Sequence, residues 1–199
     1  MRIQTALLTA LLALGLQAQE AFLVKPYLQL GDAPRASNRE RLDLLWHAES
    51  REGTWTVEVQ GAKRWEPQAA PTFRTLDVPP LPAHRIYRAT LRNLAPGHAV
   101  PYRVKLNGAV VFAAEAQPRK SGAHRMVVFG DAADGSKEQT AIAKAVAATQ
   151  PDAVFITGDL VYGRGRASEY RHHFFPVYNS EDVPLMRRVP FLGACPSNR

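Results

Sequence analysis

The distribution of apolar and polar positions divides the chain into two parts with different patterns. Between residues 21 and 117, apolar and polar side chains alternate in short segments such as 55–59, which is the period of a half-buried β-strand. Turn-forming pairs separate the segments, and Asn107-Gly108 is a strong hairpin signal. About seven strands in about a hundred residues are typical of an immunoglobulin-like sandwich, here with Trp46 in its core. The predicted strands are 22–30, 42–47, 54–60, 72–78, 85–91, 102–106 and 110–114.

From residue 125 the apolar residues form continuous runs, which is typical of strands buried in a parallel sheet. Ser136 and Gln139 have the spacing of a capping box, in which each side chain binds the backbone N–H of the other at the start of a helix. Alternation of strand and helix implies a parallel sheet with right-handed crossovers. The predicted strands are 126–129, 153–157 and 190–194, and the predicted helices start at residues 137 and 167 and end before Pro151 and Pro176.

The first residues have the features of a secretory signal. Arg2 precedes an apolar run over 6–16, and the small Ala18 follows at a plausible cleavage point. The run is shorter than the roughly 20 residues that a membrane-spanning helix needs. A buried N-terminal helix is the alternative, but polar residues at 17, 19 and 20 end the run without an amphipathic continuation. We therefore expect a signal peptide over 1–18, a secreted or periplasmic protein, and no membrane span after cleavage.

Composition narrows the possible partners. Lys and Arg number 25 against 18 Asp and Glu, for a net charge of +7, but no basic block reaches the length typical of a nucleic-acid patch. Nucleic-acid binding is therefore not expected, whereas a basic surface attracts anionic substrates. A single Cys excludes a disulfide scaffold and a thiolate zinc site.

Two Gly-Asp pairs carry the candidate chemistry. Gly130-Asp131 and Gly158-Asp159 follow consecutive buried strands, at the sheet edge where open parallel sheets bind ligands. One such pair is a common turn, but two at equivalent strand ends indicate a site. Two converging carboxylates repel one another unless a cation lies between them, and hard oxygen ligands suit Mg, Mn, Zn or ferric iron. The glycines are expected to provide the sharp backbone bend into the site.

The segment 158–162 resembles the Gly-Asp-x-x-Tyr motif of purple acid phosphatases, which are calcineurin-like metallophosphoesterases. In addition, residues 94–97 and 102–104 resemble the corner of the fibronectin type III-like domain with which those enzymes begin. The resemblance implies an all-β sandwich followed by a truncated α/β metallophosphoesterase domain. The expected boundaries are the sandwich at 21–117, a linker at 118–124, and the start of an incomplete phosphoesterase domain at 125–199.

The same resemblance implies roles for individual residues. Asp131 and Tyr162 would hold a ferric ion, Asp159 would bridge to a second metal (Fe²⁺, Zn²⁺ or Mn²⁺), and Asn198 would bind that second metal. Arg199 occupies the position of the family's catalytic His, so no catalytic residue is predicted with that role. The implied reaction is the hydrolysis of a small phosphate ester by a water that two metals activate. Because the family's histidine ligands come from later motifs, we expect this chain to be inactive by itself.

Several alternatives stay open. Arg164 and Arg166 could bind substrate phosphate through their guanidinium forks, or they could belong to a solvated turn. Asp134 could be an extra ligand or a loop acid, and His172 and His173 are interpreted as surface or packing residues of a helix. The alternative function is that of a non-catalytic secreted β-sandwich binding module with a vestigial phosphoesterase segment. The sequence does not predict the oligomeric state.

Overall fold

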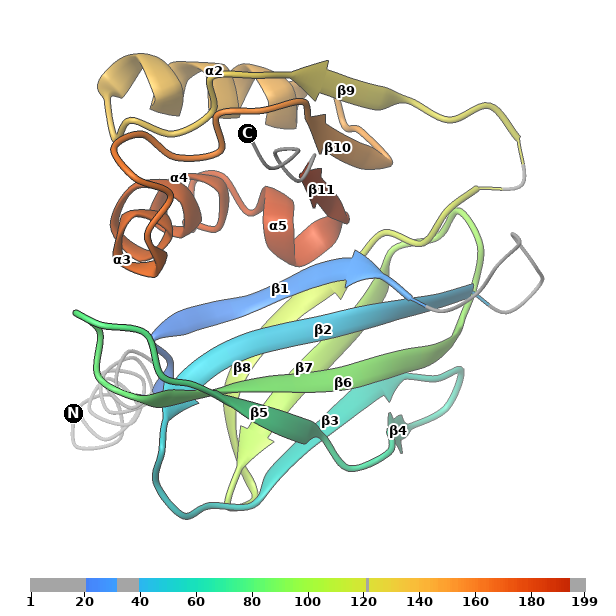
Figure 1. Ribbon diagram of the computed structural model, residues 1–199. Coiled ribbons are helices and arrows are strands. Elements are labelled where there is room, and N and C mark those ends of the chain that lie inside the picture. Colours follow the sequence, from blue (N-terminus) through green and yellow to red (C-terminus); the bar gives the residue numbers. More distant parts are fainter. Residues whose placement is uncertain (1–20, 32–39, 121, 194–199) are drawn as a thin grey trace, which may run out of the picture.

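A β-sandwich and a smaller α/β unit form the part of the chain that the computed structural model describes, residues 21–31, 40–120 and 122–193 (Figure 1). The predicted signal peptide at 1–18, and Asn198 and Arg199 with it, lie outside the described residues. In the described part, no helix has the length and apolar character needed to cross a membrane.

The sandwich consists of two four-stranded antiparallel sheets, which confirms the predicted fold class. One sheet has the order β1-β2-β6-β5 and the other has the order β4-β3-β7-β8. The strand that the pattern did not predict is β4, a three-residue polar segment that is too short to show alternation. The bounds are β1 (Val24–Leu30), β2 (Glu40–Glu49), β3 (Trp55–Gln60), β4 (Trp65–Pro67), β5 (Thr72–Leu76), β6 (His84–Leu94), β7 (Val100–Leu106) and β8 (Ala109–Ala116).

Aromatic rings fill the centre of the sandwich. Trp46 is fully buried, as predicted, and it stacks on Tyr87 with 5.3 Å between ring centroids and an interplanar angle of 7°. Trp55 lies 5.4 Å from both rings and completes the cluster. Offset or tilted pairs of this kind stabilise a core beyond the area they bury. Trp65 lies outside this cluster and is half-buried. The guanidinium of Arg103 stacks over its ring, 4.2 Å from the ring centroid.

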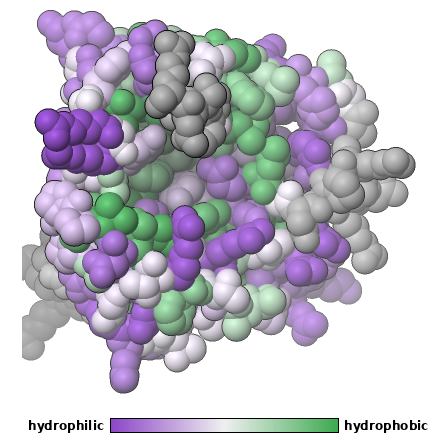
Figure 2. Space-filling model, viewed as in Figure 1, coloured by the Kyte–Doolittle hydropathy of each residue, from purple (hydrophilic) through white to green (hydrophobic). Residues whose placement is uncertain are grey.

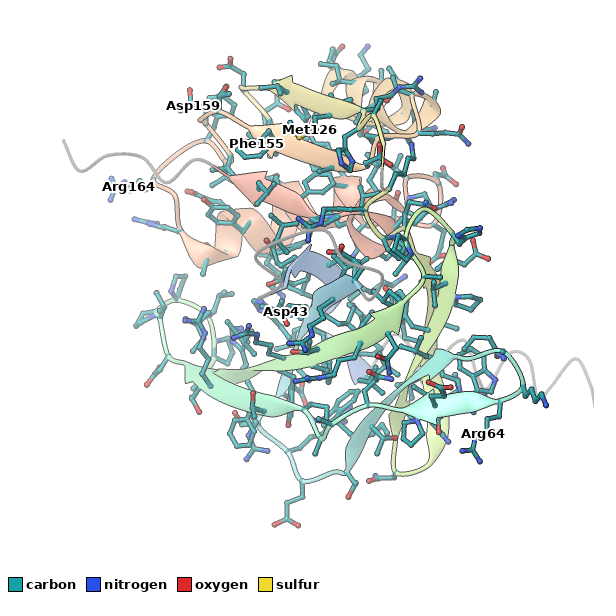
Figure 3. All side chains as sticks on the ribbon, turned by 90° about the vertical axis from the view of Figure 1, so that its right-hand side faces the viewer. Asp43, Arg64, Met126, Phe155, Asp159 and Arg164 are labelled. Atoms are coloured by element: carbon teal, nitrogen blue, oxygen red, sulfur yellow. The ribbon has the colours of Figure 1, made fainter. Side chains whose placement is uncertain are left out.

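The α/β unit contains a three-stranded parallel sheet of order β11-β10-β9, which confirms the prediction for this part. In the described part, helices pack on one face of this sheet, while Met126 and Val128 (each 58% exposed) and Phe155 (38%) lie on the other (Figure 3). The bounds are β9 (Met126–Phe129), α2 (Lys137–Ala148), β10 (Ala153–Ile156), α3 (Ala167–Glu169), η1 (Tyr170–Phe174), α4 (Phe175–Tyr178), α5 (Leu185–Arg188) and β11 (Phe191–Gly193).

The start of α2 follows the capping prediction in part. The Ser136 Oγ accepts a hydrogen bond from the Gln139 N–H at 3.1 Å, as expected. The predicted reciprocal bond, from the Ser136 N–H to the Gln139 side chain, does not form, because the Gln139 Oε1 accepts from the N–H of Gly135 at 2.7 Å. The Ser136 N–H donates instead to the Asp134 carboxylate at 2.8 Å, so Asp134 caps this backbone group from the loop. Gln139 is buried, and its amide also donates to the His173 carbonyl, which ties α2 to η1.

The prediction that Pro176 closes the second helix is wrong. The chain passes from α3 through a π-helical turn, η1, into α4, and Pro176 lies in the first turn of α4. Proline is tolerated in the first turn, where its missing N–H has no intrahelical acceptor. The helical segment therefore continues to Tyr178, whose hydroxyl donates to the Ala132 carbonyl at 2.6 Å.

The sandwich and the α/β unit share an apolar core along β1, and hydrophobic residues gather at their junction (Figure 2). Val24 and Tyr27 of β1 pack with residues of α4 and β11, and the Tyr27 and Phe175 rings lie 5.0 Å apart. Across the same junction, the buried Tyr102 hydroxyl donates to the Arg187 carbonyl at 2.9 Å. The two parts are therefore joined by both apolar contacts and buried hydrogen bonds.

Candidate metal centre

The two Gly-Asp turns lie side by side where β9 and β10 end. The strands pair in parallel with Phe129 opposite Ile156, so both chains leave the sheet at the same edge. The Ala132 N–H donates to the Asp159 carbonyl at 2.8 Å, which joins one turn to the other. Parallel pairing thus brings Asp131 and Asp159 together, although 28 positions separate them in the sequence.

The sharp bend at each turn comes from the aspartates. Asp131 has a φ of 53° and Asp159 a φ of 48°, whereas Gly130 and Gly158 do not have positive φ values. The expectation that the glycines provide the bend is therefore wrong. Aspartate is one of the few side chains that adopt the left-handed region at modest cost, and such conformations concentrate at functional sites. Gly130 has a different role, since a Cβ there would lie 3.1 Å from the Thr157 Oγ1.

Tyr162 completes the group. Its hydroxyl donates to the Asp131 Oδ1 at 2.5 Å, while the ring is 40% exposed. The hydrogen bond to Asp131 raises the pKa of Tyr162 to about 12, and the charges of Asp131, Asp159 and Asp134 act in the same direction. A phenol in the field of three carboxylates keeps its proton until a cation neutralises that field. The structure therefore brings together Asp131, Asp159 and Tyr162 as the sequence predicts.

The chemistry of these donors fits a hard metal ion. Carboxylate and phenol oxygens are the ligands that ferric iron and hard divalent cations prefer. Within the described ranges, no cluster of three or more His, Cys, Asp or Glu residues could hold a metal. The described part of the chain thus offers two carboxylates and one phenol. Asn198, the fourth predicted ligand, lies outside the described residues.

A short loop carries the predicted phosphate-binding arginines. The Glu169 carboxylate accepts hydrogen bonds from the backbone N–H of Arg164 at 3.1 Å and of Arg166 at 2.8 Å, and it thereby closes the loop. Gly163 and Gly165 have φ values of 110° and 65°, which other residues rarely adopt. Glu169 is a functional residue of this loop that the sequence pattern was not used to predict, although an acid three residues after Arg166 has the capping-box spacing.

Both guanidinium groups are exposed, and neither makes a hydrogen bond or ion pair with another described residue. Asp159 and Arg164 lie at the same end of the α/β unit, with Arg164 at the outer edge (Figure 3). His172 is exposed and His173 is half-buried, its ring close to Gly135, so both lie where surface and packing residues of a helix are expected.

The described architecture is that of a β-sandwich followed by an α/β unit with an oxygen-rich sheet edge. Among solved structures, the chain is similar to the purple acid phosphatase PPD1 from yellow lupin (Lupinus luteus) seeds, with a TM-score of 0.62 and 19% sequence identity. The match covers 85% of this chain and 34% of the lupin protein, so the chain spans about a third of the length of that enzyme. No protein-family model matches the sequence, and a search among curated proteins found no match either. At the level of the fold, the resemblance to purple acid phosphatases is confirmed.

Proposed function

We propose that this chain forms part of the metal centre of a secreted or periplasmic phosphoesterase. The observation that carries the proposal is the hydrogen bond between Tyr162 and Asp131 beside Asp159, at the edge of a parallel sheet. Similarity in fold to a purple acid phosphatase supports the same interpretation. The substrate class is a small phosphate ester, which the net positive charge of the chain favours.

Each residue of the group has a distinct part in the proposal. Asp131 and Tyr162, whose oxygen atoms lie 2.5 Å apart, would hold a ferric ion, and Asp159 in the neighbouring turn would provide a carboxylate for the second metal. A bound metal pair supplies charge neutralisation for the phosphate and lowers the pKa of a water. Arg164 and Arg166 orient the phosphate with their exposed guanidinium forks.

The test is titration of the metal-free protein with Fe³⁺, followed by visible absorption. Iron bound to a phenolate absorbs in the visible range by charge transfer, which carboxylates alone do not produce. We expect the band in the unmodified protein, its loss in Tyr162→Phe, and a severalfold weaker affinity for iron in Asp131→Asn. Asp77→Asn is the matched control, because it removes the same charge from an exposed position after β5, away from Tyr162. A band that persists in Tyr162→Phe contradicts the proposed ligand set.

Inorganic phosphate tests the second half of the proposal. If the iron-loaded site accepts phosphate, added phosphate shifts the absorption band, and the shift requires higher phosphate concentrations in Arg164→Gln or Arg166→Gln. A band that phosphate does not move would mean that the site holds metal without serving a phosphoesterase. A protein that binds no metal favours the non-catalytic binding module.

A further inference from the structure

A cavity of about 220 Å³ lies at the junction between the sandwich and the helical segment α3–η1–α4. Strands β1, β2, β5 and β6 form one side, and Figure 1 shows α3 and α4 above β1 on the other. Much of the wall is apolar, with Val24, Leu76, Ile86 and Phe175 among its residues. The cavity shares no residue with the candidate metal centre, which lies at the ends of β9 and β10.

Two arginine side chains line this apolar cavity, one from each side of the junction. Arg74 comes from β5 and Arg171 from the π-helical turn η1, and both line the cavity. Arg74 is solvent-exposed and Arg171 is half-buried, and neither makes a hydrogen bond or ion pair with another described residue, whereas Arg88 of the same sheet is paired with Asp43. The described residues that line the cavity include no Asp or Glu. Two cations beside apolar walls without a counter-charge are the arrangement that an anion with an apolar body would complete.

Two histidines in the same wall form a hydrogen-bonded pair whose protons can be assigned. The His84 Nδ1 lies 2.9 Å from the Pro82 carbonyl, which only accepts, so this nitrogen carries a proton. In the neutral ring the His84 Nε2 then accepts, and the His47 Nδ1, 3.2 Å away, donates to it. The His47 Nε2 is left as a bare acceptor. It becomes a third donor for an anion when it takes up a proton.

We propose that this cavity binds a small organic anion, an apolar body with a sulfonate, phosphate or carboxylate head, between Arg74 and Arg171. This binding site is separate from the proposed phosphoesterase centre, and binding there does not require a metal. The apolar wall accommodates the body of the ligand, while the guanidinium forks bind its head through charge-assisted hydrogen bonds. Binding fastens the helical segment that follows the Arg164 loop to the sandwich.

The electrostatics of His47 make the site sensitive to pH. Burial lowers the pKa of His47 to about 4, and the neighbouring His84, Arg74 and Arg171 act in the same direction. Two tyrosines, Tyr27 and Tyr170, also line the wall, and Tyr27 stays neutral because burial raises its pKa to about 12. A bound anion opposes the repulsion from the two arginines and raises the pKa of His47. Binding is therefore coupled to proton uptake and becomes tighter as the pH falls from 7 towards 5.

The experiment is calorimetric titration of the metal-depleted protein with benzenesulfonate, which stays fully ionised across this pH range. We expect saturable binding that is about tenfold weaker in Arg74→Gln and in Arg171→Gln, the usual effect of losing one charge-assisted hydrogen bond. Arg92→Gln is the matched control, because it removes the same charge from an exposed position of the sandwich outside the cavity. His47→Gln removes the dependence on pH between 7 and 5.

Two further ligands separate the parts of the proposal. Benzenesulfonamide has nearly the same shape without the charge, and sulfate has the charge without the apolar body. We expect both to bind at least tenfold more weakly than benzenesulfonate. Absence of benzenesulfonate binding, unchanged affinity in both cavity-arginine variants, or equal affinity for either comparison ligand overturns the proposal. Thermal denaturation of each variant confirms that it is folded before the titration.

Discussion

A buried polar network around Asn179 fastens the helical segment to the sandwich, and its removal gives a sharp test of how the two parts are joined. The Asn179 Nδ2 donates to the carbonyls of Lys25 and Pro26, each at 3.1 Å. The Asn179 Oδ1 accepts from the Nε of Arg187 at 3.0 Å. Asn179 and Arg187 are 4% and 5% exposed, so solvent does not replace these hydrogen bonds.

The sequence of β1 explains why those carbonyls need a partner. Pro26 has no N–H for the sheet ladder, and the pairing of β1 with β2 shifts register between Val24 and Tyr27. Proline in a strand is confined to edges and bulges, and β1 is an edge strand with such an irregularity. The two carbonyls face the helical segment, and Asn179 satisfies both.

Asn179→Leu keeps a similar side-chain volume and removes three hydrogen bonds. It leaves the buried Pro26 carbonyl, the part-buried Lys25 carbonyl and one N–H of a buried guanidinium unsatisfied, at about 1 kcal/mol for each carbonyl and about 1.5–3 kcal/mol for the charged donor. The expected loss is about 3–5 kcal/mol, a large share of the roughly 5–15 kcal/mol that stabilises a typical domain. For a chain of this size, 1 kcal/mol corresponds to about 2–4 °C in Tm, so we expect a decrease of about 10 °C.

Differential scanning calorimetry measures this change directly. Thr75→Leu on β5 is the control, because it adds the same side chain at an exposed position. Asn179→Asp retains an acceptor for Arg187 but turns a carboxylate oxygen toward the two carbonyls, so we expect a decrease in Tm for this variant as well. A decrease of less than about 3 °C for Asn179→Leu would refute the reasoning, since it would mean that the network contributes little to the junction.

Two further predictions concern the same junction. Tyr102→Phe deletes the donor to the Arg187 carbonyl and should cost about 1–2 kcal/mol, seen as a decrease of about 3–6 °C in Tm; an unchanged Tm would contradict the role of this bond. The pKa of His47 is about 4 in the folded chain against an ordinary value of 6.5, so between these values the unfolded chain binds a proton that the folded chain does not. Stability should therefore fall as the pH falls through this window, by up to about 3 kcal/mol, and urea denaturation of His47→Gln should lack that component.

Local rules predicted most of the fold. Alternation in the sandwich and apolar runs in the α/β unit reflect which faces of a strand are buried, and that information is present in any short window. Two of the errors arose where adjacent residues of the chain offer the backbone an alternative hydrogen bond or helical turn. Pro176 continues a helix because η1 precedes it with a π-helical turn, and Gln139 binds the N–H of Gly135 because Asp134 occupies that of Ser136.

The candidate site was predictable for a related reason. Parallel pairing places the carboxyl ends of consecutive strands together, so the spacing of two Gly-Asp pairs after two buried strands is enough to imply one site. The conformation within the turns was not predictable in this way, since either residue of a Gly-Asp pair can adopt a positive φ. The Thr157 hydroxyl lies so close to Gly130 that a side chain there would be crowded, which accounts for the glycine of the first turn, whereas nothing lies within 4 Å of a Cβ at Gly158.

The junction could not be predicted from the sequence at all. Asn179 and Lys25 are 154 positions apart, and no period or motif relates an amide in a helical segment to the carbonyls of a bulged edge strand. The same holds for Arg74 and Arg171, which meet at one cavity only because β5 and η1 approach each other across the junction. Sequence patterns record which elements are buried, whereas the pairing of particular buried polar groups depends on how complete elements dock. The polar residues of the junction are therefore where this structure adds most to the sequence, and where mutations test it most directly.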